Sequence, residues 1–209
     1  MEYLDYYDEF GNHLGVETRE KIHELGLWHK TVQNWLYTKD GKVLFQIRKN
    51  TGKFYTTSSG HVDAGETLEE AYIRETREEI GLDMTNENPK VIDLVTWVMD
   101  KKKDGKTIKD RAKSTFFLGL YDGDFNDFKF DTNEVLGVVL VDAKETLDLF
   151  KKGHGQIDAL LIIDKNGVNE QIKRQVDFDE FLLFEGEDII QKYGKILTNV
   201  IEETKKITS

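Results

Sequence analysis

Three glutamates stand within about one helical turn of one another in the stretch GHVDAGETLEEAYIRETREEIGL, residues 60–82 of the 209-residue chain. Glu75, Glu78 and Glu79 are spaced by three and four residues, which places side chains on one face of a helix. Carboxylates that converge in this way repel one another. Two interpretations follow: a solvated helix face, or a site for a hard divalent cation, which prefers oxygen ligands.

The neighbouring residues favour the metal site. A solvated face predicts lysines one turn away from the glutamates, because opposite charges at that spacing relieve the repulsion. No lysine occurs between Gly60 and Asp83. The order of Gly, Glu and Arg along the stretch is also specific. Seven Gly, Glu and Arg residues stand at fixed spacings in this stretch. With this chain's own frequencies of these residue types, such an arrangement would arise by coincidence with a probability on the order of 10⁻⁵ or less.

The spacing resembles the Nudix box, G-x5-E-x7-R-E-U-x-E-E-x-G-U, where U is a bulky apolar residue. All seven fixed positions match, and the one departure is Thr76 at the first U position. Thr76 falls with Ile73 and Ile80 on the apolar side of the helix and can pack through its methyl group. The resemblance implies a pyrophosphohydrolase that uses Mg²⁺ or Mn²⁺. The residues that it places on the metal are Glu75, Glu78, Glu79 and, through its carbonyl, Gly60.

The chemistry of diphosphate hydrolysis accounts for these residue types. Water attacks one phosphorus while negative charge builds on the bridging oxygen, and a divalent cation offsets that charge. By the resemblance, Arg74 would orient Glu75. Glu66 would hold the loop that precedes the helix, and Gly60 and Gly81 would let the backbone pass where a side chain would block it.

The box leaves open which group takes the proton from the attacking water. Across the family it is sometimes a box glutamate and sometimes a carboxylate on a later loop. Here Glu134, within DTNEV, is the first candidate on a later loop, and Asp131 is the second. The alternative is that Glu134 is an ordinary charged residue that opens a strand, because loops usually carry charge. The predicted catalytic residues are therefore Glu78, Glu79, Arg74 and Glu134.

The N-terminal region carries a second, less specific resemblance. Its D-x-x-D-x-x-G-x-x-x-G pattern, followed by R-x-x-x-H, looks like the isopentenyl-diphosphate-isomerase-like branch of Nudix proteins. True isomerases use a cysteine just before the box glycine and a glutamate on a later strand. Ser59 occupies the cysteine position, and no glutamate occurs between Glu87 and Glu134. Because serine cannot act as the acid or base that a thiolate can, the sequence favours a hydrolase over an isomerase.

Histidines bear on the same choice. Isomerases of that branch bind a metal through histidines, one of them directly after the box glycine. His61 matches that position, and His23 and His29 lie roughly where others would come from. A lone histidine gains a ligand role only with partners. We therefore interpret His61 as an ordinary loop residue and His29 as a residue at the entry of a strand, with ligand roles as the alternative.

The predicted substrate is a small molecule with a diphosphate linked to another moiety, which we take to be a nucleoside. Arg48 and Lys49 end a predicted strand near the box and are candidate phosphate contacts. The basic run from Lys101 to Lys113 could also steer phosphates, although a solvated hairpin tip is the commoner explanation. Four aromatic residues could stack on a base, or belong to the core as aromatics in strands usually do: Trp35, Phe54, Tyr55 and Trp97.

The elements that must position these residues follow from turn signals and periodicity. A helix is predicted over 67–80, with Thr67 and Glu70 as a capping box and Gly81 at its end. One hairpin is predicted from strands at 31–37 and 43–49, and a second from strands at 91–99 and 114–121. A buried strand at 134–142 and a short helix at 143–153 are predicted to follow.

The C-terminal segment carries an apolar stripe with helical period, from Ile189 to Ile201. We interpret it as a helix that packs on the chain's own core, with a homodimer or partner surface as the alternative. The elements together predict a mixed α/β fold, with a mixed sheet sandwiched between helices and a C-terminal helical extension. The expected parts are an N-terminal extension at 1–30, the Nudix domain at 31–153 and a C-terminal extension at 154–209.

Composition narrows the partners. The net charge of −11 provides no global positive field that would attract nucleic acid. The absence of cysteine excludes thiol catalysis, disulfides and cysteine-based zinc sites. The acidic N-terminus lacks the order of a signal peptide, and the longest apolar runs are too short to span a bilayer. We expect a cytoplasmic protein with a small-molecule partner, no nucleic acid and no membrane; a homodimer stays open.

Overall fold

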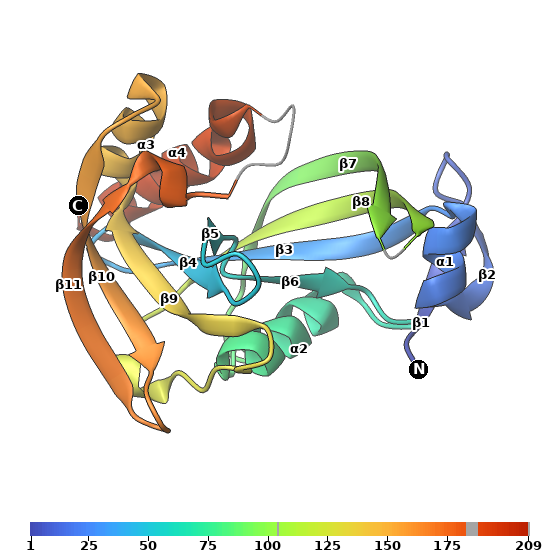
Figure 1. Cartoon of the computed structure of the whole chain (residues 1–209), viewed down its shortest axis with the longest axis horizontal. Helices are drawn as coiled ribbons and strands as arrows, with labels where there is room; N and C mark the ends of the chain where they lie inside the picture. Colours follow the sequence, from blue (N-terminus) through green and yellow to red (C-terminus); the bar gives the residue numbers. More distant parts are fainter. Residues whose placement is uncertain (104, 183–187, 209) are drawn as a thin grey trace.

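The computed structural model describes residues 1–103, 105–182 and 188–208. A nine-stranded mixed sheet forms the centre, and a separate two-stranded sheet lies near the N-terminus (Figure 1). The strands are β1 (Tyr3–Tyr7), β2 (His13–Thr18), β3 (His29–Tyr37), β4 (Lys42–Arg48), β5 (Phe54–Tyr55), β6 (Ser58–His61), β7 (Lys90–Lys103), β8 (Lys106–Leu120), β9 (Val135–Asp142), β10 (Gln156–Asp164) and β11 (Asn169–Asp177). The helices are α1 (Arg19–Leu25), α2 (Leu68–Ile80), α3 (Ala143–Lys152) and α4 (Ile189–Thr208).

Strand β3 organises the sheet. The strand order is β11-β10-β9-β4-β3-β8-β7, with β5 paired to β4 and β6 paired to β3. β3 is parallel to β8 and antiparallel to β4 and β6. Thr31 pairs with Ser114 on β8 and with His61 on β6, so these three residues form one row across the sheet. Both predicted hairpins and the predicted strand and helix at 134–153 are present.

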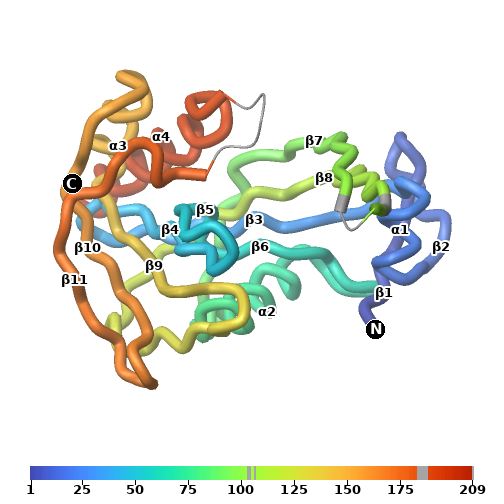
Figure 2. Tube along the Cα trace, in the orientation of Figure 1, coloured from blue at the N-terminus to red at the C-terminus, as the bar shows by residue number. Residues whose placement is uncertain are grey.

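Helices cover both faces of the sheet, and the predicted fold class is confirmed. α3 and α4 lie on one face and α2 on the other, as the tube trace in Figure 2 also shows. Neighbouring β3 side chains alternate between the two cores, as strand geometry requires. Trp35 packs against Tyr193 of α4, with ring centroids 5.6 Å apart. Leu36 belongs to the opposite core, with Tyr72 of α2.

The helix that carries the glutamates begins and ends as its sequence predicts. The Thr67 hydroxyl accepts a hydrogen bond from the Glu70 amide (3.2 Å), and the Glu70 carboxylate accepts one from the Thr67 amide (2.8 Å). This capping box satisfies amide groups that the first turn leaves without partners. At the other end Gly81 has φ +77°, a left-handed conformation that ends the helix.

The buried side of α2 differs from the prediction. Ile73 is only partly buried, whereas Ala71 and Tyr72 are fully buried, because the Tyr72 ring fills the space next to Phe117 with centroids 5.3 Å apart. Thr76 is also fully buried, but a methyl contact is not its only role. Its hydroxyl donates to the Tyr72 carbonyl (2.7 Å) and lies within hydrogen-bond distance of Asn34 and Ser58, so a buried polar network occupies this position.

The second hairpin is longer than predicted, because β7 and β8 pair through most of the basic run. Lys101 and Lys102 near its tip are exposed, as a solvated tip predicts. Asp100 lies opposite Lys109, and the Asp100 carboxylate also receives the Arg111 guanidinium at 2.7 Å. Lys113 donates to the Glu9 carbonyl (2.8 Å). Residue 104 and the side chains of Lys103 and Lys106 lie outside the described part of this hairpin.

The C-terminal stripe packs on the chain's own core, as we preferred. Its buried members on α4 are Ile189, Tyr193, Ile196, Leu197 and Val200. The sequence did not predict β10 and β11, which extend the sheet beyond β9. β11 is an edge strand with mostly exposed polar side chains, so it has no apolar alternation to reveal it. Within the described residues, no helix is both long and apolar enough to cross a bilayer.

Candidate metal and diphosphate site

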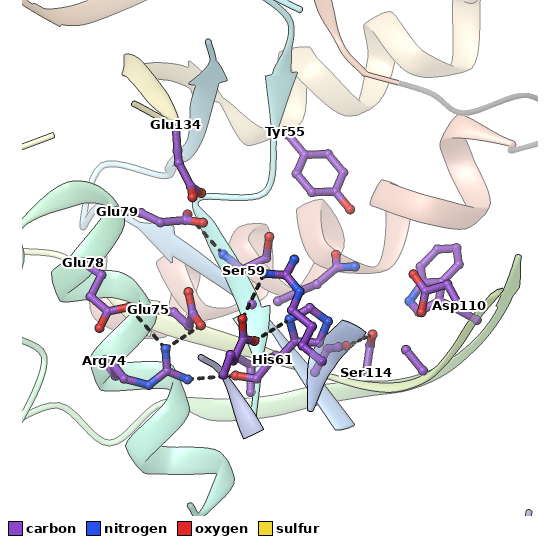
Figure 3. Close-up of a pocket in the computed structure, with 18 of the residues that line it drawn as sticks. Tyr55, Ser59, His61, Arg74, Glu75, Glu78, Glu79, Asp110, Ser114 and Glu134 are labelled. Carbon is purple, nitrogen blue, oxygen red and sulfur yellow. Dashed lines mark hydrogen bonds and ion pairs between the residues drawn. The ribbon is translucent and has the colours of Figure 1, made fainter. Parts of the chain in front are cut away.

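A cavity of about 630 Å³ opens over β6, β3 and β8, beside α2 (Figure 3). The α2 glutamates line one side, and residues of β7 and β8 line another. The predicted site residues that line the cavity are Arg48, Gly60, Arg74, Glu75, Glu78, Glu79 and Glu134. Residues from α2 and from the later loop before β9 therefore share one space, although more than fifty positions separate them in the chain.

The three box glutamates have different environments. Glu79 is 8% exposed and the Glu75 side chain is 12% exposed, whereas the Glu78 side chain is 60% exposed. The solvated-face interpretation therefore fails for two of the three. Glu78 lies at the rim, where it can meet a ligand and water at the same time.

Arg74 connects the carboxylates. Its guanidinium makes a two-point contact with Glu66, at 2.8 and 2.9 Å, and donates to Glu75 at 2.6 Å and to Glu78 at 3.2 Å. It also donates to the His61 carbonyl at 2.8 Å. Glu66 in turn accepts from the Asp63 amide at 2.9 Å. These are the contacts expected of an orienting arginine and of a glutamate that holds the preceding loop.

Burial makes the charged forms of the inner glutamates costly. Burial raises the pKa of Glu75 to about 7, although the nearby Arg74 acts in the opposite direction. Burial also raises the pKa of Glu79 well above its ordinary value, and the charges of Glu75 and Glu134 add to this effect. The Glu79 carboxylate accepts hydrogen bonds from the Gln46 side chain (3.0 Å) and the Ser59 amide (3.2 Å).

This donor set fits a hard divalent cation. Glu75, Glu79 and Glu134 present carboxylate oxygens to one cavity, and Arg74 alone cannot balance their negative charge. A buried carboxylate that lacks a compensating cation tends to take up a proton instead. Mg²⁺ or Mn²⁺ prefers this kind of oxygen ligand.

Both box glycines lie where neighbouring atoms leave no space for a side chain. A side chain at Gly60 would collide with the Glu75 carboxylate, so only glycine lets the β6 backbone come this near to α2. A side chain at Gly81 would meet the backbone of Lys129. Gly81 does not line the cavity; it fixes the loop that leads from α2 toward the later acidic residues.

Of the later candidates, the structure brings only one to the cavity. Glu134 lines it, whereas the Asp131 carboxylate accepts hydrogen bonds from the amide and side chain of Asn133. The predicted phosphate contact of Lys49 is wrong in placement. Its ammonium group donates to the Thr132 carbonyl at 2.5 Å, away from the cavity, because successive residues at a strand end point in opposite directions. Arg48 does line the cavity.

We predict that metal binding and pH act together on stability. Because the pKa of Glu75 rises from 4.5 to about 7 on folding, the metal-free folded chain holds a proton that the unfolded chain has released between these pH values. Its stability should therefore fall as the pH rises through this window, by ~3 kcal/mol at most. A divalent cation that replaces the proton should restore this stability.

Thermal unfolding at pH 5 and pH 7.5, with and without MgCl₂, measures the effect. We expect the gain in Tm from MgCl₂ to be larger at pH 7.5. An equal gain at both pH values would contradict the assignment of Glu75 as a ligand.

Three histidines cluster beside the cavity, and one of them, His61, lines it. The ring nitrogens of His23, His29 and His61 lie within 4.8 Å of one another. His29 is the first residue of β3, as we interpreted it, whereas His61 is the last residue of β6 and not a loop residue. The cluster gives both residues the partners that a ligand role requires. In the fold β6 pairs with β3, and the His23 ring of α1 contacts the His29 and His61 rings. Spacing along the sequence does not reveal these contacts, because the three histidines come from separate elements.

His29 faces a carboxylate that the sequence analysis missed. Its Nδ1 lies 3.1 Å from the Leu27 carbonyl and donates to it, which leaves the Nε2 lone pair directed toward Asp110, 3.6 Å away. Both facing atoms are buried without a hydrogen-bond partner among the described residues. Burial, and then the charge of His61, lower the pKa of His29 to about 4, so the ring is neutral at pH 7. Two facing lone pairs of this kind fit a cation between them.

The N-terminus also reaches the site. The Glu2 carboxylate lies 3.1 Å from Nδ1 of His61 and 2.9 Å from Arg19. The hydrogen bond from His61 lowers the pKa of Glu2 to about 2. Glu2, Arg19 and Asp110 all line the cavity. Arg19 belongs to the R-x-x-x-H pattern, whereas no motif marks Glu2 and Asp110, which only the fold brings together.

Comparisons with known proteins agree on one family. Residues 27–161 match the NUDIX domain family. An uncharacterized Nudix hydrolase of Clostridium acetobutylicum is 27% identical over 190 residues, which cover 87% of this chain and 90% of that protein. Another, from Rhodococcus erythropolis, is 33% identical over 94 residues, which cover 42% of this chain and 51% of that protein. A crystal structure from Deinococcus radiodurans shares the fold, with a TM-score of 0.54, 19% identity and coverage of 73% of this chain and 90% of that chain.

Proposed function

The chain belongs to the NUDIX domain family, and from this premise we propose that it is a Mg²⁺-dependent pyrophosphohydrolase whose substrate is a diphosphate linked to a nucleoside. Nudix hydrolases act on diphosphate bonds and generally use a divalent metal. The observation that carries the proposal is that the buried Glu79 and the mostly buried Glu75 share a cavity with Glu134, and that Arg74, which contacts Glu75, cannot balance the charge of all three carboxylates.

The proposed roles follow from the contacts of each side chain. Glu75, Glu78, Glu79 and the Gly60 carbonyl would hold the metal, which supplies charge neutralisation on the diphosphate and activation of water. Arg74 orients Glu75 and Glu78 through direct hydrogen bonds. Glu134 or a box glutamate takes the proton from the water that attacks phosphorus. Arg48, which lines the cavity near these carboxylates, would contact the second phosphate.

A panel of diphosphates incubated with Mg²⁺ tests this proposal. It should contain dinucleoside polyphosphates, nucleotide sugars, ADP-ribose, coenzyme A, nucleoside triphosphates and isopentenyl diphosphate. We expect release of a phosphate-containing product from at least one nucleoside-linked member, only with a divalent cation. Ligand binding without turnover of any member would instead favour a non-catalytic module that senses a nucleotide metabolite.

One observation favours a second candidate, an enzyme like isopentenyl-diphosphate isomerase. The cluster of His23, His29 and His61 is a ligand set of the kind that the isomerase-like branch implies. Against this candidate, the residue before the box glycine is Ser59, and the cavity-lining positions of β8 hold Asp110, Ala112 and Ser114 in place of a glutamate. Double-bond migration in isopentenyl diphosphate without phosphate release would establish the isomerase.

The location in the cell and the oligomeric state are further parts of the proposal. A cytoplasmic location rests on the sequence alone and is tested by cell fractionation. The homodimer that the sequence left open is tested by the mass of the protein in solution. The apolar stripe of α4 contributes little to a dimer surface, because five of its members are buried in the chain's own core.

A further inference from the structure

The structure separates the four aromatic residues that could stack on a base. Trp35 and Phe54 are each 1% exposed and belong to the core. Tyr55 and Trp97 line the cavity instead. Tyr55 comes from β5 and Trp97 from β7, whereas the box glutamates come from α2, so we call the part of the cavity lined by these two residues its aromatic end.

Trp97 lies next to a small residue of the cavity lining. In the sheet register it pairs with Ala112 of β8, and Ala112 pairs with His29 of β3. The neighbouring cavity-lining positions of β8 are larger and polar, namely Asp110 and Ser114. The methyl group of Ala112 therefore leaves room over the floor next to the indole, where a flat group can lie.

The aromatic end is rich in cations. The Arg48 guanidinium lies 5.2 Å from the Tyr55 ring centroid, and Lys192 Nζ lies 5.1 Å from that centroid and 6.0 Å from the Trp97 centroid. Lys192 belongs to α4, so the C-terminal extension helps to build this end. Figure 3 shows the Tyr55 hydroxyl directed toward the space between the labelled residues. The end thus carries positive charge, whereas the α2 side carries carboxylates.

Exposure distinguishes Trp97 from the core tryptophan. The indole Nε1 atoms of Trp97 and Trp35 are both buried without a hydrogen-bond partner among the described residues, so the unpaired donor does not separate them. Trp97 is only partly buried and lines the cavity, whereas Trp35 is 1% exposed. Indole rings are common where a planar ligand stacks, because every base has a π-face.

We infer that Trp97 stacks on the base of a nucleoside diphosphate derivative whose diphosphate lies at Arg48 and the α2 glutamates. This inference rests on the proposed function and adds the part of the substrate that the cavity selects. The base lies over Ala112 against the indole. Arg48, held over the Tyr55 ring, stands between the base and the carboxylates and contacts the phosphate nearer the nucleoside.

Two ligands that cannot be hydrolysed test the inference. An α,β-methylene nucleoside diphosphate and methylenediphosphonate carry the same P–C–P group and differ only in the nucleoside. Their dissociation constants are measured by calorimetry with Mg²⁺ in the full-length protein. In the wild type we expect the nucleoside ligand to bind ~5- to 100-fold more tightly, the range expected for one base stacked on an aromatic ring.

The ratio of the two dissociation constants measures the preference for the nucleoside. Trp97→Ala should remove most of this ratio and leave the affinity for methylenediphosphonate unchanged, whereas Trp97→Phe should keep most of the ratio. Leu94→Ala is the matched control, because Leu94 lies on the same strand, is 73% exposed and faces away from the cavity. The inference is overturned if Trp97→Ala keeps the wild-type ratio, if it weakens both ligands equally, or if the wild type shows no preference for the nucleoside.

The two proposals fail separately. Loss of the ratio in Trp97→Ala, combined with no turnover of any diphosphate, would uphold the base site and contradict the hydrolase. Turnover of diphosphates in the panel, combined with an unchanged ratio in Trp97→Ala, would uphold the hydrolase and contradict the base site.

Discussion

Glu79→Gln is expected to lower kcat by at least ~10³-fold while the fold stays intact, because it removes a proposed ligand charge and a candidate base. The amide can still accept the hydrogen bonds that Gln46 and the Ser59 amide donate to Glu79. Since burial already opposes the charge of Glu79, the metal-free variant should be at least as stable as the wild type at neutral pH. Activity and metal-free stability should therefore change in opposite directions.

Steady-state kinetics and thermal unfolding, each with and without Mg²⁺, measure both parts. Glu69→Gln is the matched control, because Glu69 is an exposed residue of the same helix that does not line the cavity. The control should keep wild-type turnover and the wild-type gain in Tm from Mg²⁺. Near-normal turnover of Glu79→Gln would show that the proposed site is wrong.

Arg74→Ala is expected to give the largest loss of stability among the box variants, about 3–5 kcal/mol. Arg74 donates to Glu66, Glu75 and Glu78, and its own side chain is only 26% exposed. Its removal leaves the Glu66 and Glu75 carboxylates buried without their cation. Turnover should fall as well, because Glu75 loses the contact that orients it.

Chemical denaturation and kinetics of Arg74→Ala, Arg74→Lys and Arg77→Ala separate charge from geometry. Lysine restores the charge but not the two-point contact with Glu66, so Arg74→Lys should recover stability more than activity. Arg77 lies on the same helix but is 55% exposed and pairs with an exposed aspartate, so Arg77→Ala should cost no more than ~1 kcal/mol. Equal costs for Arg74→Ala and Arg77→Ala would contradict the network.

The parts that the sequence predicts well are those that depend on local spacing. The glutamate helix, with its cap at Thr67 and its end at Gly81, follows from residues within one short stretch. The two hairpins follow from turn residues between apolar strands. Convergence of Glu75 and Glu79 also follows from helical spacing, but their burial does not, because it depends on β4 and β6 packing across the helix.

The parts that it predicts poorly depend on which strands become neighbours. His23, His29, His61 and Asp110 come from four elements, and only the pairing of β3 with β6 and β8 brings them together. For the same reason, the sequence could not distinguish Trp97 at the cavity from Trp35 in the core. Lys49 shows a local limit: residues adjacent in sequence at a strand end face different spaces.

Hydrolysis in ¹⁸O-labelled water is the most direct test of the central claim, that water attacks phosphorus at the Glu75, Glu78 and Glu79 site. The substrate is the most active diphosphate of the panel, and mass spectrometry follows its products with the wild type and Glu79→Gln. The predicted result is one ¹⁸O atom in one phosphate-containing product, formed only with a divalent cation and only by the wild type. Product formation without ¹⁸O in any phosphate group, or equal labelling by Glu79→Gln, would contradict the account.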